Sequence, residues 1–259
     1  MGKEQDLLEY VLSRPDLEDL RGNPQKVLDA IDKFAEKVPL MTVGKYKGEL
    51  ILKEIEKLEP TLMIELGCYV GYLAILFGGA LSRVNATISD TGCTLSKYFS
   101  FEINEEFAAI AKQFIELAGL SDCVEIIVGK AGNTLPDFEE RIMTTFKKYT
   151  AVDLVFIDHW KDMYVPDLRV LESLGLVAPG TVICADNIYY PGVPDYVDYV
   201  HGSPQSRNTH NSTVVNVSNR MYPGRWNILY DSKTCPVTDP AKGIDDAVEI
   251  TRCVSYLSG

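Results

Sequence analysis

The stretch TLMIELGCYVG, residues 61–71, passes from a continuous apolar run into a turn that contains two glycines. A short apolar run of this kind is typical of a strand buried on both faces, and the glycines permit a sharp turn into a following helix. By the same pattern we expect strands at 61–66, 97–103, 123–129, 152–158 and 180–186. Helices are expected after the first four of them, at about 72–81, 104–120, 134–149 and 164–174. This alternation predicts an α/β fold, a Rossmann-like parallel sheet with helices on both faces.

The regions outside this alternation differ in character. Residues 3–58 are predicted to be helical, with Asn23 as an N-cap before Pro24. Residues 82–96 form a long polar connection. After Pro191-Gly192 the rhythm changes, and residues 207–219 and 225–231 are predicted as β-rich segments joined by a hairpin-like turn. We therefore expect one domain over residues 1–259. Its predicted parts are N-terminal helices over the active site (1–58), a core sheet (59–232) and a C-terminal extension (233–259).

Composition excludes several classes of protein. The chain has 259 residues, with 37 acidic against 25 basic side chains and a net charge of −12. Such a balance argues against nucleic-acid binding, which needs clustered Lys and Arg. Six cysteines without a CxxC motif indicate reduced thiols. The N-terminus has no apolar signal segment, and no apolar run approaches the ~18 residues that a membrane span needs. We therefore expect a cytoplasmic protein that binds neither membrane nor nucleic acid.

The glycine turn is a candidate cofactor site. Glu65, Gly67 and Gly71 follow the G-x-x-x-G spacing rather than the G-x-G-x-x-G fingerprint of dinucleotide binding. By itself this motif is weak, and a tight strand–helix turn explains it equally well. Glu102 ends the second strand, where an acid commonly binds ribose hydroxyls, although a solvated acid at a helix start is the alternative. Two acids beside a glycine turn favour S-adenosylmethionine over NAD.

A second candidate site lies at the ends of the fourth and fifth strands. Asp158, Asp186 and Asn187 occupy these ends, which meet at one edge of a parallel sheet. Their hard oxygen atoms suit Mg²⁺, although each side chain taken singly is also typical of a turn or helix cap. Lys161 lies three residues after Asp158, where a dication would favour its neutral, proton-accepting form. A surface lysine paired with an acid is the alternative. Trp160 could stack on a flat ring or simply pack.

These residues bear a family resemblance. IELGCYVGY, FEIN, VFIDHWKDMYVPD, GTVICADN and PGVPDY resemble the Mg²⁺-dependent catechol O-methyltransferases, over about residues 23–217. The resemblance implies a seven-stranded class I methyltransferase sheet, mostly parallel, with a C-terminal antiparallel hairpin. It also implies transfer of a methyl group from S-adenosylmethionine to one hydroxyl of a catechol-type vicinal aromatic diol, by a monomer.

The resemblance further implies roles for individual residues. It assigns Asp158, Asp186 and Asn187 to Mg²⁺ and Lys161 to the general base. The cofactor contacts it implies are Met41, Val43, Glu65, Gly67, Tyr69, Glu102, Ile103, Asp158, His159 and Trp160. The substrate contacts it implies are Pro39, Lys161, Asn187, Pro191 and Asn216.

The sequence also departs from the family pattern. Asn216 stands where the family has an acid that orients the second hydroxyl, and Pro39 and Val217 stand where it has aromatic residues. Leu73 replaces a serine at the cofactor, and Ala131-Gly132 replace a polar pair near the adenine. These departures leave two alternatives open. One is the same chemistry on a larger phenylpropanoid or flavonoid diol, and the other is a catalytically impaired protein that binds S-adenosylmethionine.

Overall fold

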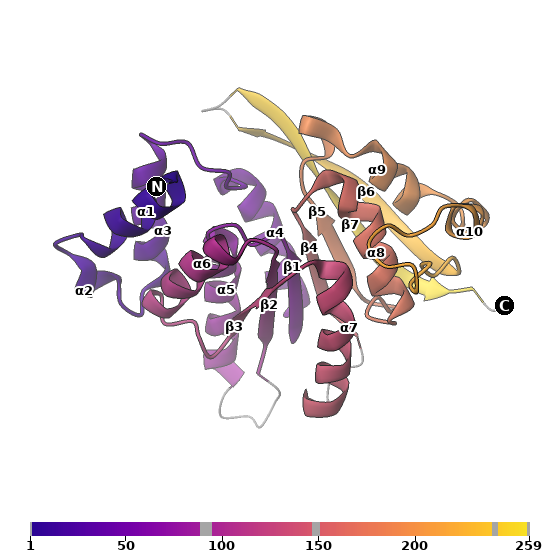
Figure 1. Ribbon diagram of the computed structural model, residues 1–259, viewed down its shortest axis with the longest axis horizontal. Helices are drawn as coiled ribbons and strands as arrows, with labels where there is room; N and C mark the ends of the chain where they lie inside the picture. Colours follow the sequence, from indigo (N-terminus) through magenta and orange to yellow (C-terminus); the bar gives the residue numbers. More distant parts are fainter. Residues whose placement is uncertain (1, 89–94, 147–150, 240–242, 258–259) are drawn as a thin grey trace. The chain divides into compact units, whose positions relative to one another are not determined.

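The computed structural model describes residues 2–88, 95–146, 151–239 and 243–257. The chain folds into two compact units, which Figure 1 shows in the colours of the sequence. The first unit comprises Met1–Thr61 and Gly67–Gly129, and the second comprises Leu62–Leu66 and Lys130–Gly259. Each unit contains strands and the helices that pack on them.

The first unit holds most of the N-terminal helices. Its elements are α1 (Lys3–Leu12), α2 (Leu17–Leu20), α3 (Pro24–Ala35), α4 (Lys45–Leu58), α5 (Tyr72–Ile88), β2 (Lys97–Glu102), α6 (Glu105–Leu117) and β3 (Val124–Val128). Helices α3 and α4 both pack on α5, and α1 packs on α3 and α6. Asn23 caps α3 as predicted, because its side chain accepts a hydrogen bond from the Lys26 backbone N–H at 3.1 Å.

The second unit begins with one short strand and continues from residue 130. Its strands are β1 (Leu62–Leu66), β4 (Leu154–Ile157), β5 (Val182–Ala185), β6 (Ile228–Asp239) and β7 (Ile244–Tyr256). Its helices are α7 (Ala131–Arg141), α8 (Tyr164–Ser173), α9 (Pro194–His201) and α10 (Pro204–Thr213), with shorter turns at Ile142–Phe146, Lys161–Met163 and Ile188–Gly192. Helix α8 packs between α7 and α9.

The strands form a seven-stranded sheet in the order β3-β2-β1-β4-β5-β7-β6. The pairs β2–β3, β1–β4 and β4–β5 are parallel, whereas β5–β7 and β6–β7 are antiparallel. Every residue of β1, β4 and β5 is buried, as expected for strands with apolar side chains on both faces. The predicted mostly parallel α/β sheet with a C-terminal antiparallel hairpin is therefore confirmed.

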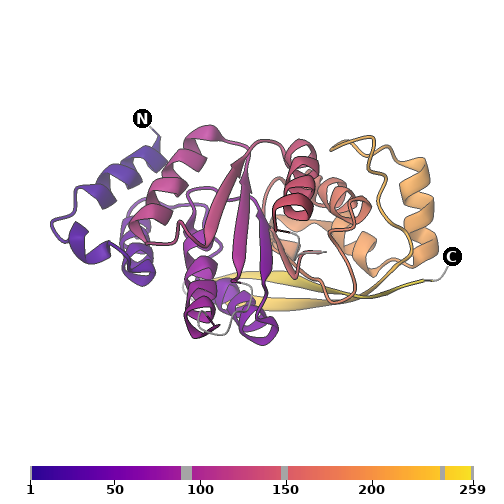
Figure 2. The same cartoon turned by 90° about the horizontal axis from the view of Figure 1, so that it is seen from below.

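The position of that hairpin corrects the sequence prediction. The antiparallel pair is β6 with β7, the long yellow ribbon in Figure 2; of the predicted segments 207–219 and 225–231, only residues 228–231 belong to it. Residues 233–239 and 244–256, predicted as an extension outside the core, are strands of the sheet. Pro236 lies within β6, opposite Ala247. Because β6 is at the edge of the sheet, a residue without an N–H is tolerated there, although Pro argues against a strand in sequence alone.

Two helices also differ from the prediction. Residues 207–213, predicted to be β-rich, lie in α10. Its start is set by Ser203, whose hydroxyl accepts a hydrogen bond from the Ser206 backbone N–H at 3.1 Å, and by Pro204 in the first turn. Helix α5 continues to Ile88, so the first part of the predicted 82–96 connection is helical, while residues 89–94 lie outside the described residues.

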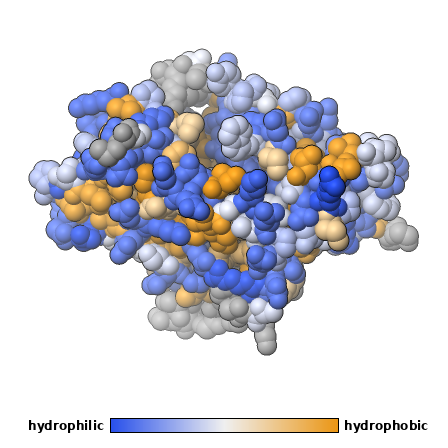
Figure 3. Space-filling model, in the orientation of Figure 1, coloured by the Kyte–Doolittle hydropathy of each residue, from blue (hydrophilic) through white to orange (hydrophobic). Residues whose placement is uncertain are grey.

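The surface is mainly hydrophilic on the face shown in Figure 3, with smaller hydrophobic areas among the charged residues. The net charge of −12 is consistent with this surface. In the parts of the chain that the structure describes, no helix combines the length and the apolar composition that crossing a bilayer requires.

Candidate active site

In the first unit, the glycine turn is held by Glu102 at the end of β2. The Glu102 carboxylate accepts hydrogen bonds from the backbone N–H groups of Cys68 at 3.1 Å and Tyr69 at 2.7 Å, both through Oε2. Its Oε1 accepts from the Asn104 N–H at 2.8 Å. The side chain is only 7% exposed. A carboxylate offers about four acceptor sites, so roughly one remains for a further donor such as a ribose hydroxyl.

The turn itself has the backbone that its glycines permit. Gly67 and Gly71 have φ values of 104° and 86°, in the left-handed region. A Cβ at Gly71 would lie 2.9 Å from the Cβ of Ala111 on α6, so only glycine allows this close packing. Tyr69 between them also has a positive φ, of 51°, which is uncommon for a tyrosine. Such strain is found where a surrounding network holds the residue in place.

That network involves the Tyr69 side chain. Its hydroxyl donates a hydrogen bond to Glu4 Oε1 on α1 at 2.6 Å, and its ring packs edge-to-face on Phe107 at 5.1 Å. Burial, followed by the Glu4 carboxylate, raises the pKa of Tyr69, while a backbone hydrogen bond from Met41 acts in the opposite direction. The structure thus brings the predicted cofactor residues Met41 and Tyr69 together.

The other residues predicted at the cofactor lie at varied depths. Glu65 is fully buried in β1 of the second unit. Val43 is half-buried. Met41 and Ile103 are exposed on the first unit, as is Pro39, which was predicted to contact the substrate.

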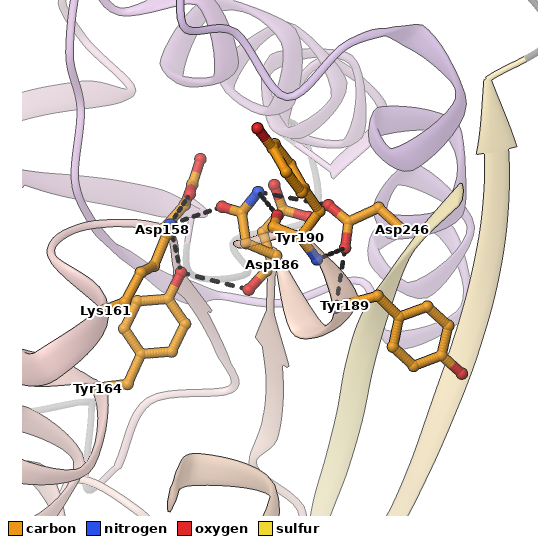
Figure 4. Close-up of polar contacts among 8 residues, drawn as sticks. Asp158, Lys161, Tyr164, Asp186, Tyr189, Tyr190 and Asp246 are labelled. Carbon is orange, nitrogen blue, oxygen red and sulfur yellow. Dashed lines mark hydrogen bonds and ion pairs between the residues drawn. The ribbon is translucent and has the colours of Figure 1, made fainter. Parts of the chain in front are cut away.

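In the second unit, two of the three predicted metal residues, Asp158 and Asn187, contact the ammonium group of the predicted base, Lys161. Lys161 Nζ lies 3.0 Å from Asp158 Oδ1 and 2.5 Å from Asn187 Oδ1, and these residues follow β4 and β5 (Figure 4). The Tyr164 hydroxyl accepts a hydrogen bond from Lys161 Nζ at 2.9 Å and donates one to the Asp186 carbonyl at 3.3 Å. Burial, with Asp158 and Asp186 nearby, raises the pKa of Tyr164 well above its ordinary value, so it stays a neutral phenol.

The Asn187 amide has a defined orientation. Asn187 has a left-handed backbone, with φ 61° and ψ 37°, a conformation that asparagine tolerates. Its Nδ2 donates to the Tyr190 carbonyl at 3.0 Å and to Asp246 Oδ2 at 3.3 Å. Because both neighbours of the nitrogen are acceptors, the amide oxygen faces Lys161. The carbonyl oxygen is therefore the atom that Asn187 offers to a cation.

His159 takes part in a separate network. Its Nε2 lies 2.7 Å from Asp167 Oδ2 in α8, and its ring stacks on that of Tyr164 at 5.3 Å. The other Asp167 oxygen accepts a hydrogen bond from the Ser218 hydroxyl. His159 is therefore oriented by the protein, and its buried Nδ1 has no hydrogen-bond partner among the described residues.

Ser218 also explains one departure from the family pattern. A Cβ at Gly132 would lie 2.0 Å from the Ser218 hydroxyl, and the Gly132 carbonyl accepts a hydrogen bond from Asn219 Nδ2 at 3.0 Å. The segment 218–219 thus occupies the space where a larger side chain at the start of α7 would point. Leu73, another departure, is buried in α5 as a packing residue.

The residues predicted for flat-ring and substrate contacts have mixed positions. Trp160 is 74% exposed, and Pro191 is exposed in the Ile188–Gly192 turn. Asn216 is 3% exposed; its Nδ2 donates to the carbonyls of Pro166 at 2.9 Å and Tyr222 at 2.7 Å. Its Oδ1 accepts the Ser218 backbone N–H at 3.1 Å. The Asn216 amide therefore makes three hydrogen bonds within the protein, and its contact with the acceptor stays a prediction.

The donor set is compatible with Mg²⁺. Among the residues that the structure describes, no three His, Cys, Asp or Glu side chains form a group that could hold a metal ion. Two carboxylates and an amide oxygen at adjacent strand ends are nevertheless hard oxygen donors of the kind that Mg²⁺ binds together with water. Two of these oxygens, Asp158 Oδ1 and Asn187 Oδ1, already contact one cationic group, the Lys161 ammonium.

Comparison with known proteins defines the family. A family model described as O-methyltransferase matches residues 23–211. Catechol O-methyltransferase of Bos taurus is 34% identical over 237 residues, which covers 90% of this chain and 79% of the relative. That of Mus musculus is 39% identical over 218 residues, covering 82% of this chain and 73% of the relative.

The chain belongs to the catechol O-methyltransferase family. As a member, it is an S-adenosylmethionine-dependent O-methyltransferase. The fold agrees, since the crystal structure of the O-methyltransferase from Bacillus cereus in complex with SAH superposes with a TM-score of 0.58 at 20% identity, covering 96% of each chain. The family resemblance stated from the sequence motifs is thereby confirmed.

Two residues that contact the predicted metal and base residues of this methyltransferase, Tyr164 and Asp246, were not identified from sequence. Tyr164 lies within the quoted motif VFIDHWKDMYVPD, three residues after Lys161, a spacing that places the two on one face of a helical turn. That spacing is a usable signal. Asp246 lies 59 residues after Asn187 on a strand that the sequence did not predict, so no local signal existed.

Proposed function

We propose that the protein transfers a methyl group from S-adenosylmethionine to one hydroxyl of a catechol-type vicinal aromatic diol, in a reaction that requires Mg²⁺. The observation that carries the proposal is the convergence of Asp158 Oδ1, Asn187 Oδ1 and the Tyr164 hydroxyl on Lys161 Nζ. A set of hard oxygens beside one amine suits an acceptor that must be both chelated and deprotonated.

The residues have separate roles in this proposal. Asp158, Asp186 and Asn187 would hold Mg²⁺, which supplies a Lewis acid that makes a phenol easier to ionise. Lys161 in its neutral form accepts the proton of the reacting hydroxyl. The Tyr164 hydroxyl keeps that amine in place, since it bonds both Nζ and the Asp186 carbonyl.

The chemical step balances without any other reactant. The acceptor's O–H bond breaks and its proton passes to Lys161 Nζ, while the oxygen forms a bond to the methyl carbon. The methyl–sulfur bond breaks, and the products are the methyl ether and S-adenosylhomocysteine. In the first unit, the glycine turn with Glu102 and Tyr69 would hold the methyl donor, and much of the rate would come from positioning.

The arrangement of the two hydroxyls on the acceptor tests the proposal. Methyl transfer from labelled S-adenosylmethionine should occur on 1,2-diols such as catechol and be at least 10²-fold slower in kcat/KM on resorcinol, whose hydroxyls cannot chelate one ion. Phenylpropanoid and flavonoid 1,2-diols in the same panel report the size of the acceptor slot. Equal rates on catechol and resorcinol would contradict the chelation role.

The expected cytoplasmic location and monomeric state remain predictions. Light scattering of the purified protein and cell fractionation can check them.

A further inference from the structure

Asp246 lies outside the set of residues that bind or react in the proposed function, yet it contacts that set directly. It is on β7 and only 6% exposed. Its Oδ1 accepts the backbone N–H groups of Tyr189 at 3.0 Å, Tyr190 at 3.1 Å and Ala247 at 2.8 Å. Its Oδ2 accepts Asn187 Nδ2 at 3.3 Å. One carboxylate thus accepts hydrogen bonds from the backbone of Tyr189 and Tyr190 and from the side chain of Asn187 (Figure 4).

The contact to Asn187 has a chemical consequence for the neighbouring cation position. A rotation of the amide by 180° would turn its NH₂ group toward the Lys161 ammonium, and its oxygen toward Asp246 Oδ2 and the Tyr190 carbonyl. Both new contacts would be repulsive, donor to donor and acceptor to acceptor. The amide oxygen is directed at the cation because a carboxylate lies behind the amide nitrogen.

We propose that Asp246 is a positioning residue. By orienting the Asn187 carbonyl oxygen, it sets the affinity of the proposed Mg²⁺ site (Asp158, Asp186 and Asn187) for a divalent cation. This inference rests on the proposed Mg²⁺ site. Groups that orient a metal ligand from behind alter metal affinity by about 10- to 100-fold when they are replaced. Asp246 also holds the backbone of Tyr190, whose side chain is 66% exposed beside Pro191.

A purely structural role for Asp246 predicts a different outcome, and Asp246→Asn separates the two. The asparagine retains one oxygen, which can accept the three backbone N–H groups. It replaces the other oxygen by an NH₂ group, which opposes the NH₂ group of Asn187. The matched control is Asp245→Asn, which makes the same charge change one residue away. Asp245 is exposed and its carboxylate accepts the Thr238 hydroxyl at 2.8 Å.

The experiment is a direct titration of the purified proteins with Mn²⁺ followed by electron paramagnetic resonance, with Mg²⁺ as competitor and without turnover. We expect Asp246→Asn to weaken cation binding at least tenfold and Asp245→Asn to change it less than twofold. Binding of S-adenosylhomocysteine should be equal in all proteins, which shows that each variant is folded.

A second pair of variants covers the case in which Asp246→Asn folds poorly. In Asn187→Asp two carboxylates face each other. Adding Asp246→Asn on that background restores one donor and one acceptor, so it should tighten cation binding, the opposite sign to its effect on the wild type. Loss of this reversal, or equal effects of Asp245→Asn and Asp246→Asn, would overturn the role of Asp246. Absence of cation binding by the wild type would overturn the proposed Mg²⁺ site and this inference together.

Discussion

Lys161 is the residue on which the proposed chemistry depends most. Its amine contacts three oxygen atoms, those of Asp158, Tyr164 and Asn187. Replacing Lys161 by alanine should lower kcat by about 10²–10⁴-fold, the usual contribution of a general base. Single-turnover methyl transfer to catechol measures the effect, with S-adenosylhomocysteine binding as the control for folding.

Lys161→Arg separates proton acceptance from charge. A guanidinium keeps the positive charge and the donors but stays protonated, so it cannot act as a base. We expect Lys161→Arg to be as impaired as Lys161→Ala in the same assay. A rate within a few-fold of the wild type would show that charge alone is needed and that the base lies elsewhere.

The proximity of Asp158 and Asn187 was predictable from sequence because strand ends converge. Asp158, Asp186 and Asn187 each follow a short apolar strand, and parallel strands place such ends at one edge. Asn216 was assigned to the acceptor by resemblance alone, and the structure shows its amide occupied by three hydrogen bonds within the protein.

Helix α8 is tied to its neighbours by a buried carboxylate. Glu172 accepts hydrogen bonds from the hydroxyls of Tyr199 on α9 and Tyr230 on β6, both at 2.7 Å, and from the Arg225 N–H at 2.9 Å. Burial raises the pKa of Glu172 above its ordinary value of 4.5, against the effect of these donors. Because α8 begins at Tyr164, this carboxylate stabilises the helix that carries the hydrogen-bond partner of Lys161.

Stability should therefore depend on the protonation of Glu172. Between its ordinary pKa and its raised folded value, the folded protein binds more protons than the unfolded chain. This contribution is fully present below about pH 4.5 and is lost as the pH rises through the folded value. In Glu172→Gln, whose amide can pair with tyrosine hydroxyls, that decline should be absent. Urea unfolding at several pH values measures the free energy of unfolding of each protein. The control is Glu140→Gln, which replaces an exposed acid on α7. Identical pH profiles for the wild type and Glu172→Gln would contradict a role of Glu172 in the pH dependence.

Elements with a regular apolar pattern were predicted correctly. Elements that depend on a helix cap, on tertiary packing or on their place in the sheet were not. β4 and β5 are continuous apolar runs, and both occur as expected. α10 is polar throughout and depends on the Ser203 cap and on packing of the buried Arg207, so its pattern gave no helical signal. β6 contains Pro236, which only an edge position tolerates, and the edge is known only once the sheet is assembled.

The assignment of β7 to the sheet can be tested by alkylating the cysteine thiols of the intact protein. Burial raises the pKa of the Cys253 thiol on β7, and that of Cys123, to about 11. Cys235 on the edge strand β6 is only half-buried. At pH 8, iodoacetamide should label Cys235 in the native protein and reach Cys123 and Cys253 only after unfolding, because the thiolate is the reactive form. Peptide mass spectrometry identifies the labelled cysteines. If Cys253 in the native protein were labelled as fast as Cys235, β7 would not be buried in the sheet.

At the scale of the whole molecule, we predict that this member of the catechol O-methyltransferase family needs a divalent cation to methylate a vicinal diol. The most direct measurement is transfer of a labelled methyl group from S-adenosylmethionine to catechol by the same preparation, first with Mg²⁺, then with EDTA, then with Mg²⁺ restored in excess. We predict that EDTA lowers the rate at least 10²-fold and that Mg²⁺ restores it. A rate that EDTA leaves unchanged would contradict the requirement for a divalent cation.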